Sequence, residues 1–597
     1  MKNRHLVALV GLSIFFVLFF SAATAPRPVD PRRALQGLDA FIQKMLVEWK
    51  VPGAAVAVVT GDRVILGRGY GFRDVENRLP ATADTLFAIG SCSKAFTTTD
   101  LAILADEAKL DWDKPVRSYL PDFKLSDPIV SERMTARDLV SHRSGLPRHD
   151  MVWYSSKFSR QELFSRLQYL ELNRDFRQLY QYNNLMFMAA GCLVEKLAGQ
   201  PWEVFTRERI LQPLGMSHTN FSVEEMAKAK DFAFPYAESK GQVLRIPFHS
   251  LDGIGPAGSL NSSVSDMARW LQLNLNRGKS GEKAIVSEVE LNRLQVPQMV
   301  ISQPLRYDEL FYGAYGLGWN INAYRGHLLV SHSGSIAGFE ARVALLPKEG
   351  FGLVVLTNLS DNSLPTVIAY QICDRLLGLD LLDWSGRTKE ERLKARQKIE
   401  EAKAEEEKER KTGSQPSHRL DEYAGSFSNS GYGTVVVDKD GQSLRGRLNE
   451  IPFVLTHYHY DIFRAQNEQQ DFDTKVSFQT GLRGDIESLA LKLEPAVGAI
   501  VFNRAPSDKL KEKDFLEKLA GQYEFSNLVG TVAWRGNAFF FFVPGKPEYE
   551  LVPYQGLEFR LKNISGFTIE FVLDGSEKVV ELISRQPDGV FRFRRKD

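Results

Sequence analysis

Hydrophobic and polar positions divide the first part of the chain into short strands and longer helices. Residues 54–60 and 63–67 are apolar runs of strand length, and the Gly-Asp pair between them predicts a tight turn. Residues 95–111 and 366–379 follow a helical pattern, while residues 351–357 form an apolar run typical of a buried strand. Strands at both ends of a helical middle predict an α+β or mixed α/β domain.

The second part of the chain has two other patterns. Within residues 386–418, the segment 390–410 mixes Glu, Lys and Arg and contains no Gly, Pro or aromatic residue. Its spacings allow i,i+4 ion pairs, which predicts a solvated helical linker. Residues 419–597 contain short apolar runs separated by Gly, Asn and Asp, and this pattern predicts an all-β, barrel-like module.

The C-terminal module also contains an internal repeat. Residues 423–427 resemble residues 519–523, and residues 462–464 resemble residues 558–560 at the same offset. The repeat favours two related halves. The sequence leaves open whether they form two small barrels or one barrel closed by both.

The N-terminal segment, residues 1–25, has the pattern of an export signal. Lys2 and Arg4 precede an uncharged apolar run, and small residues follow at 21–25. The run is also long enough to span a bilayer as an uncleaved anchor. In both cases the basic start places the remaining chain outside the cytoplasm. We therefore expect a periplasmic or secreted protein, and the sequence leaves open whether the segment is cleaved or anchors it in the membrane.

Composition excludes several classes of protein. The chain has 597 residues, of which 43% are hydrophobic and 25% are charged, so we expect a globular protein of more than one domain. Lys and Arg number 75 and Asp and Glu 74, a net charge of +1 that gives no electrostatic basis for binding nucleic acid. Three cysteines exclude a disulfide-dense scaffold. The sequence implies no metal or organic cofactor and does not set the oligomeric state.

The first motif with candidate chemistry is Ser91-Cys92-Ser93-Lys94, at the start of a predicted helix. Ser91 and Lys94 are three residues apart and therefore share one face of that helix. A serine hydroxyl needs an adjacent base to act as a nucleophile at neutral pH. A lysine amine can be that base when burial and nearby positive charge lower its pKa. The backbone N–H of Ser91, at the helix N-terminus, can stabilise an oxyanion.

Two further motifs follow along the chain. Tyr182-Asn183-Asn184 precedes an apolar helix; a tyrosine near Ser91 can hold or relay its proton, and an asparagine can bind a substrate amide or carbonyl. His332-Ser333-Gly334 follows an apolar strand, where the glycine lets a ligand approach the backbone closely. Taken singly, a surface Ser–Lys pair, a helix cap and a structural histidine are the simpler interpretations.

In their order, however, the motifs resemble the three-part pattern of the penicillin-recognising serine hydrolases. The sequence is similar in particular to the class C β-lactamase-like group, which includes DD-carboxypeptidases, D-aminopeptidases and esterases. This resemblance covers about residues 35–380 and implies an antiparallel sheet with flanking helices, that is, an α+β hydrolase domain over residues 33–385. Further matches lie at residues 51–54, 85–91, 139–147, 257–260, 263–268 and 315–319. The C-terminal module resembles the lipocalin-like module often attached to such hydrolases.

Carried over residue by residue, the resemblance implies Ser91 as the acylated nucleophile and Lys94 as the proton acceptor. Tyr182 matches the tyrosine that shares the base role. Asn184 matches the polar third position of its motif, on the substrate side of the site. Family context favours Ser91 over the neighbouring thiol of Cys92.

The third motif implies the rest of the substrate side. His332 takes the place of the lysine in the Lys-Thr-Gly motif of true β-lactamases, so a mostly neutral imidazole replaces an ammonium that would hold a substrate carboxylate. We therefore do not expect efficient β-lactam hydrolysis. Gly334 matches the glycine of that motif, and the second oxyanion N–H is expected just after it, near Ser335 or Ile336.

We therefore expect an exported serine hydrolase that works through an acyl-enzyme on small peptides, including those that contain D-amino acids, or on esters. Two alternatives stay open: a cell-wall DD-carboxypeptidase or weak β-lactamase, and a non-catalytic sensor that a ligand acylates. His457 and His459 could bind a metal from one side of a strand, but no third ligand is evident nearby.

Overall fold

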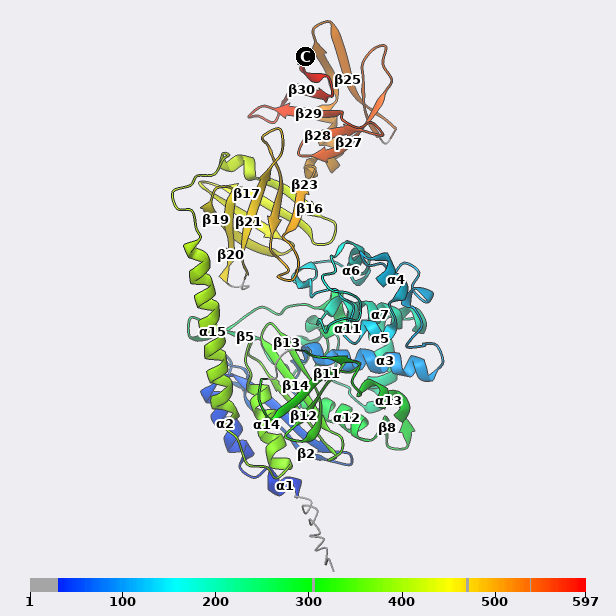
Figure 1. Cartoon of the computed structure of the whole chain (residues 1–597), viewed down its shortest axis with the longest axis vertical. Coiled ribbons are helices and arrows are strands. Elements are labelled where there is room, and N and C mark those ends of the chain that lie inside the picture. The colour runs from blue at the N-terminus through cyan, green and yellow to red at the C-terminus, as the bar shows by residue number, and fades with distance from the viewer. Residues whose placement is uncertain (1–29, 303–305, 469–471, 537, 597) are drawn as a thin grey trace, which may run out of the picture.

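The computed structural model describes residues 30–302, 306–468, 472–536 and 538–596. It consists of an α+β domain, a long helix beside it, and two β-barrels, one above the other (Figure 1). The expected export segment at residues 1–25 lies outside the described residues. Over the described ranges, we find no helix that combines the length and the apolar character needed to cross a membrane.

A nine-stranded antiparallel sheet forms the centre of the first domain and confirms the predicted α+β class. The strands predicted at 54–60 and 351–357 are neighbours in it, with Ala54 opposite Thr357, so the two ends of the domain meet within one sheet. In spatial order the strands are β10 (Met299–Val300), β11 (Leu310–Tyr315), β12 (Asn320–Tyr324), β13 (His327–Ile336), β14 (Phe339–Leu346), β15 (Phe351–Thr357), β1 (Gly53–Thr60), β2 (Val64–Asp74) and β3 (Leu79–Pro80).

Alternate side chains of this sheet enter two separate cores. Val56 and Val58 pack into one core with α2, α14 and the start of α15. Ala55 and Ala57 pack into a larger core with α3, α7 and α12, and this core continues into the first barrel. The longer helices concerned are α2 (Leu38–Glu48), α3 (Lys94–Asp106), α7 (Asn184–Ala198), α12 (Val264–Leu275), α14 (Leu364–Leu376) and α15 (Trp384–Lys408).

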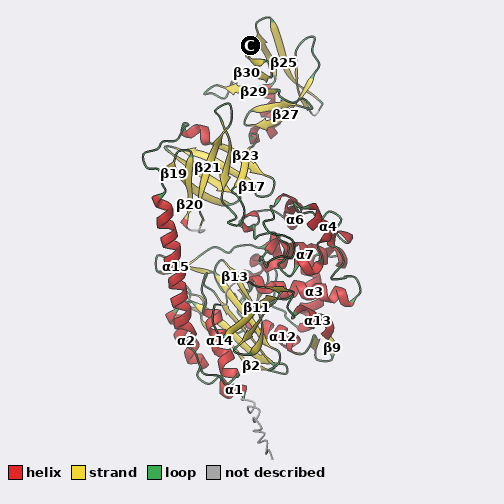
Figure 2. Ribbon diagram, viewed as in Figure 1, coloured by secondary structure: helices red, strands yellow, loops and turns green. Residues whose placement is uncertain are grey.

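Shorter elements complete the first domain, most of them on the side of the larger core (Figure 2). The short helices are α1 (Pro31–Ala34), α4 (Pro128–Arg133), α5 (Ala136–Leu139), α6 (Arg160–Arg166), α8 (Trp202–Thr206), α9 (Gln212–Leu214), α10 (Val223–Met226), α11 (Gly255–Gly258) and α13 (Glu288–Leu294). Three small strand pairs are β4 (Phe87–Ala88) with β7 (Asn261–Ser262), β5 (Tyr236–Ser239) with β6 (Gln242–Arg245), and β8 (Lys279–Ser280) with β9 (Lys283–Ala284).

Both helices predicted in this domain end earlier than expected. The helix expected to reach residue 111 is α3, which ends at Asp106, because Ala108 has a positive φ of 56°. The helix expected to reach residue 379 is α14, which ends at Leu376, because Gly378 has a φ of 65°. A residue in the left-handed region cannot continue an α-helix, so the chain turns at these two positions.

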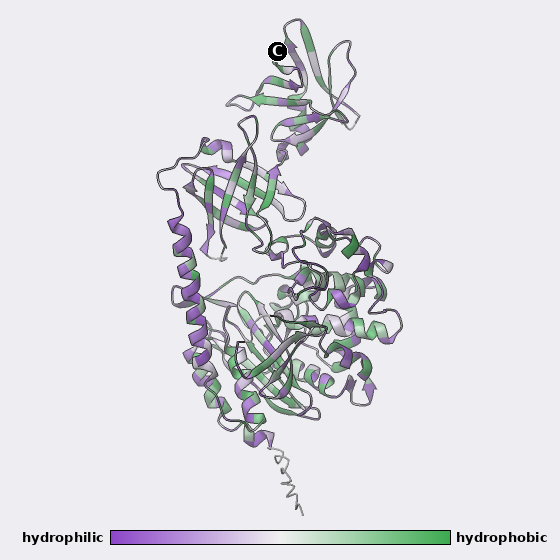
Figure 3. Ribbon diagram, viewed as in Figure 1, coloured by the Kyte–Doolittle hydropathy of each residue, from purple (hydrophilic) through white to green (hydrophobic). Residues whose placement is uncertain are grey.

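The charged segment forms the single long helix α15, as its pattern predicts. Figure 3 shows that α15 is mainly hydrophilic, and among its residues only Trp384, Ser385 and Thr388 near its start are buried. Just beyond its end, the Arg410 Nε donates a 3.0 Å hydrogen bond to the carbonyl oxygen of Tyr458 in the first barrel. The helix therefore connects the sheet domain to that barrel along a largely solvated path.

The C-terminal residues form two closed eight-stranded barrels, so of the two arrangements left open by the repeat, the structure has two barrels. The first contains β16 (Gly425–Asn429), β17 (Gly433–Asp440), β18 (Ser443–Leu448), β19 (Ile451–His459), β20 (Ile462–Asn467), β21 (Phe472–Thr480), β22 (Ile486–Leu491) and β23 (Ile500–Arg504). After α16 (Lys513–Leu519), the second contains β24 (Gly521–Phe525), β25 (Leu528–Arg535), β26 (Ala538–Phe542), β27 (Tyr549–Gln555), β28 (Glu558–Leu561), β29 (Thr568–Leu573), β30 (Val579–Gln586) and β31 (Gly589–Lys596).

Candidate active site

Ser91 and Lys94 lie one helical turn apart at the junction of two helices. Ser91 is in a 3₁₀ turn, Gly90–Ser93, which continues directly into α3 at Lys94. The Lys94 side chain is completely buried, whereas Ser91 is partly exposed. Lys94 Nζ lies 3.0 Å from Ser91 Oγ. The hydroxyl is thus reachable from solvent while the amine beside it is not.

The surroundings of Lys94 favour a neutral amine. Its Nζ donates hydrogen bonds to Asn184 Oδ1 at 2.8 Å and to the carbonyl oxygen of Ala257 at 2.7 Å. Burial, and then the positive charge of Arg148, hold the pKa of Lys94 well below its usual value. A neutral amine has two N–H groups and one lone pair. Because two oxygens that can only accept take the two N–H groups, the lone pair is left for the hydroxyl of Ser91.

Tyr182 approaches Ser91 from the start of α7. Asn183 caps this helix by accepting a hydrogen bond from the Met186 N–H at 2.9 Å, and the turn before the cap places Tyr182 over the site. The Tyr182 hydroxyl donates a 2.7 Å hydrogen bond to Ser91 Oγ. Burial raises the pKa of Tyr182 above its ordinary value, so the group is a phenol at neutral pH.

Asn184 links the amine of Lys94 to a carboxylate. Its Oδ1 accepts from Lys94, and its Nδ2 donates to Asp150 Oδ1 at 3.2 Å. Asp150 Oδ2 in turn accepts a 2.6 Å hydrogen bond from Arg148 Nε. Both polar atoms of the Asn184 amide therefore have partners within the protein, and the residue fixes the position of Lys94.

Two glycines bring strand β13 against the turn that carries Ser91. A Cβ added at Gly334 would collide with the carbonyl oxygen of Ile89 and would lie 3.0 Å from the backbone nitrogen of Ser91. A Cβ added at Gly90, whose φ is 51°, would lie 2.8 Å from the backbone nitrogen of Ser335. The missing side chains thus allow the backbone N–H groups of Ser91 and Ser335 to come together, as an oxyanion site requires.

Comparison with known proteins assigns this arrangement to a family. The family model named Beta-lactamase matches residues 38–372, which is more than half of the chain. The chain belongs to the beta-lactamase family. It is thus a member of a family of serine hydrolases, and it has their fold. A second model, a domain of unknown function (DUF3471), matches residues 409–503, which form the first barrel and the segment leading into it.

Curated relatives match the same part of the chain. The unguisins hydrolase ungD' of Aspergillus campestris is 33% identical over 374 residues, which are 59% of this chain and 67% of the relative. Protein flp of Staphylococcus aureus is 28% identical over 342 residues, 56% of this chain and 65% of the relative. The matched region spans about two thirds of the length of these relatives.

Two solved structures share the fold. The octameric penicillin-binding protein homologue from Pyrococcus abyssi has a TM-score of 0.50 at 24% identity and covers 78% of this chain and 99% of its own. EstCE1, a hydrolase with promiscuous acyltransferase activity, has a TM-score of 0.50 at 18% identity and covers 58% of this chain and 99% of its own.

His332 departs from the lysine of true β-lactamases, and its surroundings keep it uncharged. The ring is buried; its Nδ1 donates to the carbonyl oxygen of Ser333 at 2.6 Å, and its Nε2 accepts from the Tyr315 hydroxyl at 2.9 Å. Since the carbonyl can only accept, the bonds define this neutral tautomer. Burial, the largest cause, lowers the pKa of His332 to about 3. This position therefore carries no positive charge at neutral pH.

Ser335 and Glu340 form a pair beside the proposed oxyanion site. The Ser335 hydroxyl donates a 2.7 Å hydrogen bond to Glu340 Oε1. Burial raises the pKa of Glu340 to about 8. A carboxyl group that changes charge near neutral pH thus lies next to the strand residue whose backbone nitrogen approaches the turn that carries Ser91.

The other nucleophiles in the first motif are directed elsewhere. The Ser93 hydroxyl donates to the carbonyl oxygen of Gly90 at 2.7 Å and accepts from the Leu260 N–H at 3.1 Å. Cys92 is buried, and burial raises the pKa of its thiol to about 12. Neither group shares the amine of Lys94.

Metal binding by His457 and His459 finds no support in their contacts. His457 Nε2 donates to the carbonyl oxygen of Tyr460 at 2.8 Å, and His459 Nδ1 accepts from the Lys411 N–H at 3.2 Å. Among the residues that the structure describes, no group of three or more His, Cys, Asp or Glu side chains is arranged to hold a metal ion.

Several residues of the site were not identified from the sequence. The carbonyl oxygen of Ala257 lay within a matched segment, but a backbone acceptor has no signature of its own. His142, which lies in the matched segment 139–147, accepts the Asn183 N–H on its Nδ1 at 3.0 Å, and its ring centre lies 4.3 Å from that of Tyr182. Arg148 and Asp150 follow the matched segment 139–147, but no spacing rule pointed to them.

Proposed function

We propose that the protein is an exported serine hydrolase that acts through an acyl-enzyme on small peptides or esters. The observation that carries the proposal is the position of Ser91 Oγ, 3.0 Å from the amine of Lys94 and 2.7 Å from the phenol of Tyr182. A hydroxyl between a neutral amine and a phenol has a base for its proton and a proton donor for the leaving group.

Acylation is proposed to begin when Lys94 takes the proton of Ser91. The Ser91 oxygen then forms a bond to the carbonyl carbon of the substrate, and the carbonyl π electrons move to its oxygen. The backbone N–H groups of Ser91 and Ser335 stabilise this oxyanion. Tyr182 donates its proton to the leaving nitrogen or oxygen and regains one from the Lys94 ammonium as the scissile bond breaks.

Deacylation follows the same path with water as the nucleophile. Water loses a proton to Lys94 and attacks the acyl carbon. Ser91 leaves as Tyr182 donates a proton to its oxygen, and Tyr182 regains one from the Lys94 ammonium. Each group ends in its starting protonation state. The cycle uses only the three side chains and the backbone N–H groups.

The substrate class is proposed from the charge of the site and from one relative. A neutral His332 removes the ammonium that would hold the carboxylate of a β-lactam at this position. The relative with 33% identity is named for the hydrolysis of unguisins. Small peptides or esters therefore fit better than penicillins. The basic, then apolar N-terminal segment supports export.

A fluorophosphonate probe tests the nucleophile. We expect the peptide that contains Ser91 in the wild type to gain the mass of one probe less HF, because the serine oxygen displaces fluoride from phosphorus. We expect Ser91→Ala to lose both labelling and ester turnover. Ser239→Ala, a change of an exposed serine on β5, is the control and should keep both. Turnover retained by Ser91→Ala would contradict the proposal.

The same preparation separates the alternatives. Acylation by a labelled penicillin followed by slow release would favour a DD-carboxypeptidase or weak β-lactamase. Stoichiometric acylation by every ester tried, without a second turnover, would favour a ligand sensor.

A further inference from the structure

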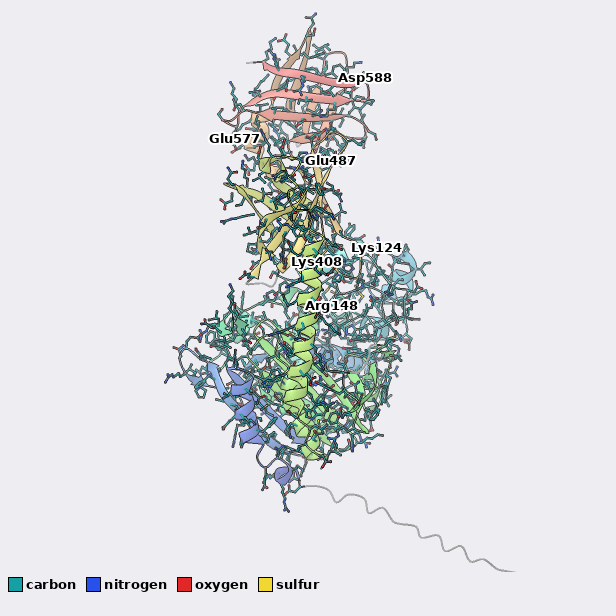
Figure 4. The ribbon with its side chains drawn as sticks, turned by 60° about the vertical axis from the view of Figure 1, so that its left-hand side comes forward. Lys124, Arg148, Lys408, Glu487, Glu577 and Asp588 are labelled. Carbon is teal, nitrogen blue, oxygen red and sulfur yellow. The ribbon has the colours of Figure 1, made fainter. Side chains whose placement is uncertain are left out.

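Arg148 lies at the edge of the site described above and gives or takes no proton in the proposed chemistry. Its side chain is 54% exposed, and its Cζ lies 5.1 Å from the centre of the Tyr182 ring (Figure 4, where Arg148 is labelled). Its Nε donates to Asp150. Within the described residues, the two terminal nitrogens of the guanidinium have no hydrogen-bond partner. Such an edge can bind a carboxylate with two parallel hydrogen bonds.

Asp150 holds the guanidinium without occupying that edge. Its Oδ1 accepts from Asn184 Nδ2 at 3.2 Å and from Trp153 Nε1 at 3.0 Å, and its Oδ2 accepts from Arg148 Nε. The carboxylate thus connects Arg148 to Asn184, whose other atom contacts Lys94. The orientation of Arg148 and the position of the catalytic amine depend on the same residue.

His149, which lies between Arg148 and Asp150 in the sequence, belongs to the contact with the first barrel. Its backbone N–H donates to Glu494 Oε2 at 2.8 Å. Its Nε2 lies 2.9 Å from the carbonyl oxygen of Glu171, and its Nδ1 lies 2.6 Å from the Tyr432 hydroxyl. Because the carbonyl can only accept, Nε2 donates, and Nδ1 accepts from Tyr432. Both ring nitrogens and the backbone N–H are therefore bonded, two of the three to the barrel.

The backbone of His149 explains why this contact matters for Arg148. His149 is completely buried, and its φ of 47° and ψ of 37° lie in the left-handed region, which is costly for a residue with a side chain. The turn sends His149 into the barrel contact while Arg148 faces solvent beside Tyr182. Tyr432 and Glu494 hydrogen-bond to the buried His149, and Arg148 is its exposed neighbour.

We propose that the first barrel completes the active site by holding His149, and that the guanidinium of Arg148 so placed receives a carboxylate of the substrate. This inference rests on the proposed function. Arg148 is then a specificity-determining residue, while Tyr432 and Glu494 are positioning residues. The cation that His332 no longer supplies on β13 is provided instead by Arg148, beside the Tyr182 ring.

Two pairs of esters test the charge preference. The first pair places the charge on the leaving group, 4-acetoxybenzoate against 4-acetoxybenzamide. The second places it on the acyl group, mono-4-nitrophenyl glutarate against 4-nitrophenyl valerate. The quantity measured is the ratio of kcat/KM for the anionic ester to that for the neutral ester, with the rate of Ser91→Ala subtracted. Since Lys94 serves both esters of a pair, changes in its pKa cancel in this ratio.

We expect the wild type to prefer the anionic member of at least one pair, and Arg148→Gln to lower that preference by about tenfold, the effect of a hydrogen-bonded charge pair. Arg148→Lys should keep part of the preference for the anionic ester. We expect Arg148→Gln to act mainly by raising the KM of the anionic ester. An unchanged ratio in Arg148→Gln, or equal losses for both esters, would overturn the assignment of Arg148.

The role of the barrel is tested with Tyr432→Phe in the full-length chain. This change removes only the hydroxyl that donates a hydrogen bond to His149 Nδ1. We expect it to lower the ratio of kcat/KM for the anionic ester to that for the neutral ester several-fold. The matched control is Arg166→Gln, which removes a 2.8 Å hydrogen bond to Ser430 in the same contact but does not involve His149. Equal ratios in the two variants would overturn the positioning role. Ester turnover that persists in Ser91→Ala would instead overturn the proposed function, and this inference with it.

Discussion

The Tyr182 hydroxyl donates a 2.7 Å hydrogen bond to Ser91 Oγ, and burial raises the pKa of this phenol. In the proposed mechanism this phenol donates to the nucleophile and therefore does not deprotonate it. The buried amine of Lys94, on the other side of the same oxygen, has the lowered pKa that a base needs. The two residues therefore suit different proton transfers: Lys94 accepts the proton of Ser91, and Tyr182 donates a proton to the leaving group.

Tyr182→Phe should affect amides more than esters. An amine leaving group must be protonated before it departs, whereas 4-nitrophenolate leaves without a proton. We expect kcat/KM for a 4-nitroanilide to fall by about 10³-fold, within the usual range for general acid–base catalysis. For the corresponding 4-nitrophenyl ester we expect a loss below that range, about tenfold. Tyr180→Phe, the same change two residues earlier, is the control. Equal losses on both substrates would argue against a proton donor at Tyr182.

Activity should rise with pH as Lys94 loses its proton. Because the pKa of Lys94 is lowered, the amine becomes neutral well below its usual range, and the acid limb of kcat/KM reports this step. The positive charge of Arg148 contributes to the lowering, so Arg148→Gln should shift the acid limb to higher pH. Arg148→Lys keeps the charge and should keep the limb. His332, with a pKa of about 3, should contribute no limb above pH 5. A shift of the limb to lower pH in Arg148→Gln would contradict this assignment.

Activity should fall again as Glu340 ionises. Its pKa is raised to about 8, so a negative charge develops beside Ser335 on the alkaline side of neutrality. That charge opposes the oxyanion that the N–H of Ser335 is proposed to stabilise. Glu340→Gln should therefore remove the alkaline limb near pH 8. The check is a pH profile with a neutral ester, and an alkaline limb that persists in Glu340→Gln would assign it to another group.

Gly334→Ala should lower activity strongly without unfolding the protein. The new methyl group would meet the carbonyl oxygen of Ile89 and push β13 away from the turn that carries Ser91. We expect a loss of about 10²-fold or more in kcat, the cost of losing an oxyanion donor. Gly67→Ala is the matched control, because a methyl group on β2 would lie at an ordinary 3.5 Å from Val64. Melting curves of both variants separate the local effect from unfolding.

Arg483→Met should destabilise the junction of the two barrels. Arg483 binds Glu558 through two hydrogen bonds of 3.0 Å, and the carboxylate is only 5% exposed. Removing the cation leaves a buried charge unpaired, which costs on the order of 3 kcal/mol. Arg464→Met, which breaks the more exposed pair with Asp473, should cost less than about 1 kcal/mol. Chemical unfolding of the full chain measures both, and equal costs would mean that the buried carboxylate finds another partner.

The local parts of the fold could be predicted because their signals are local. The charged pattern of residues 390–410 marks α15, and the Ser-x-x-Lys spacing alone places Ser91 and Lys94 on one turn. The contact between Tyr182 and Ser91 could be expected only from the order of the motifs in a known family. The periodicity of hydrophobic residues does not predict that contact.

The contacts that hold the site together could not be predicted, because they join distant parts of the chain or involve backbone atoms. His149 and Glu494 are 345 positions apart, and their bond depends on how the first barrel docks on the first domain. The Ala257 carbonyl is a backbone group that any residue could provide. Closure of each barrel depends on pairing its first strand with its last, β16 with β23 and β24 with β31, which no local pattern encodes.

The second barrel has its own hydrophobic core and meets the first barrel at the Arg483–Glu558 pair and at a short bridge between Pro506 and Gly556. In Figures 1 and 4 it stands at the end of the molecule farthest from the first domain. A proteolytic nick between the barrels would therefore release a self-contained lobe, and an early stop codon there would omit it. Both would leave every partner of His149 in place. A stop ahead of the first barrel would instead strip that histidine of two partners and expose an apolar surface. A truncation from the C-terminus therefore keeps the contacts of His149 only if it ends at the junction between the two barrels.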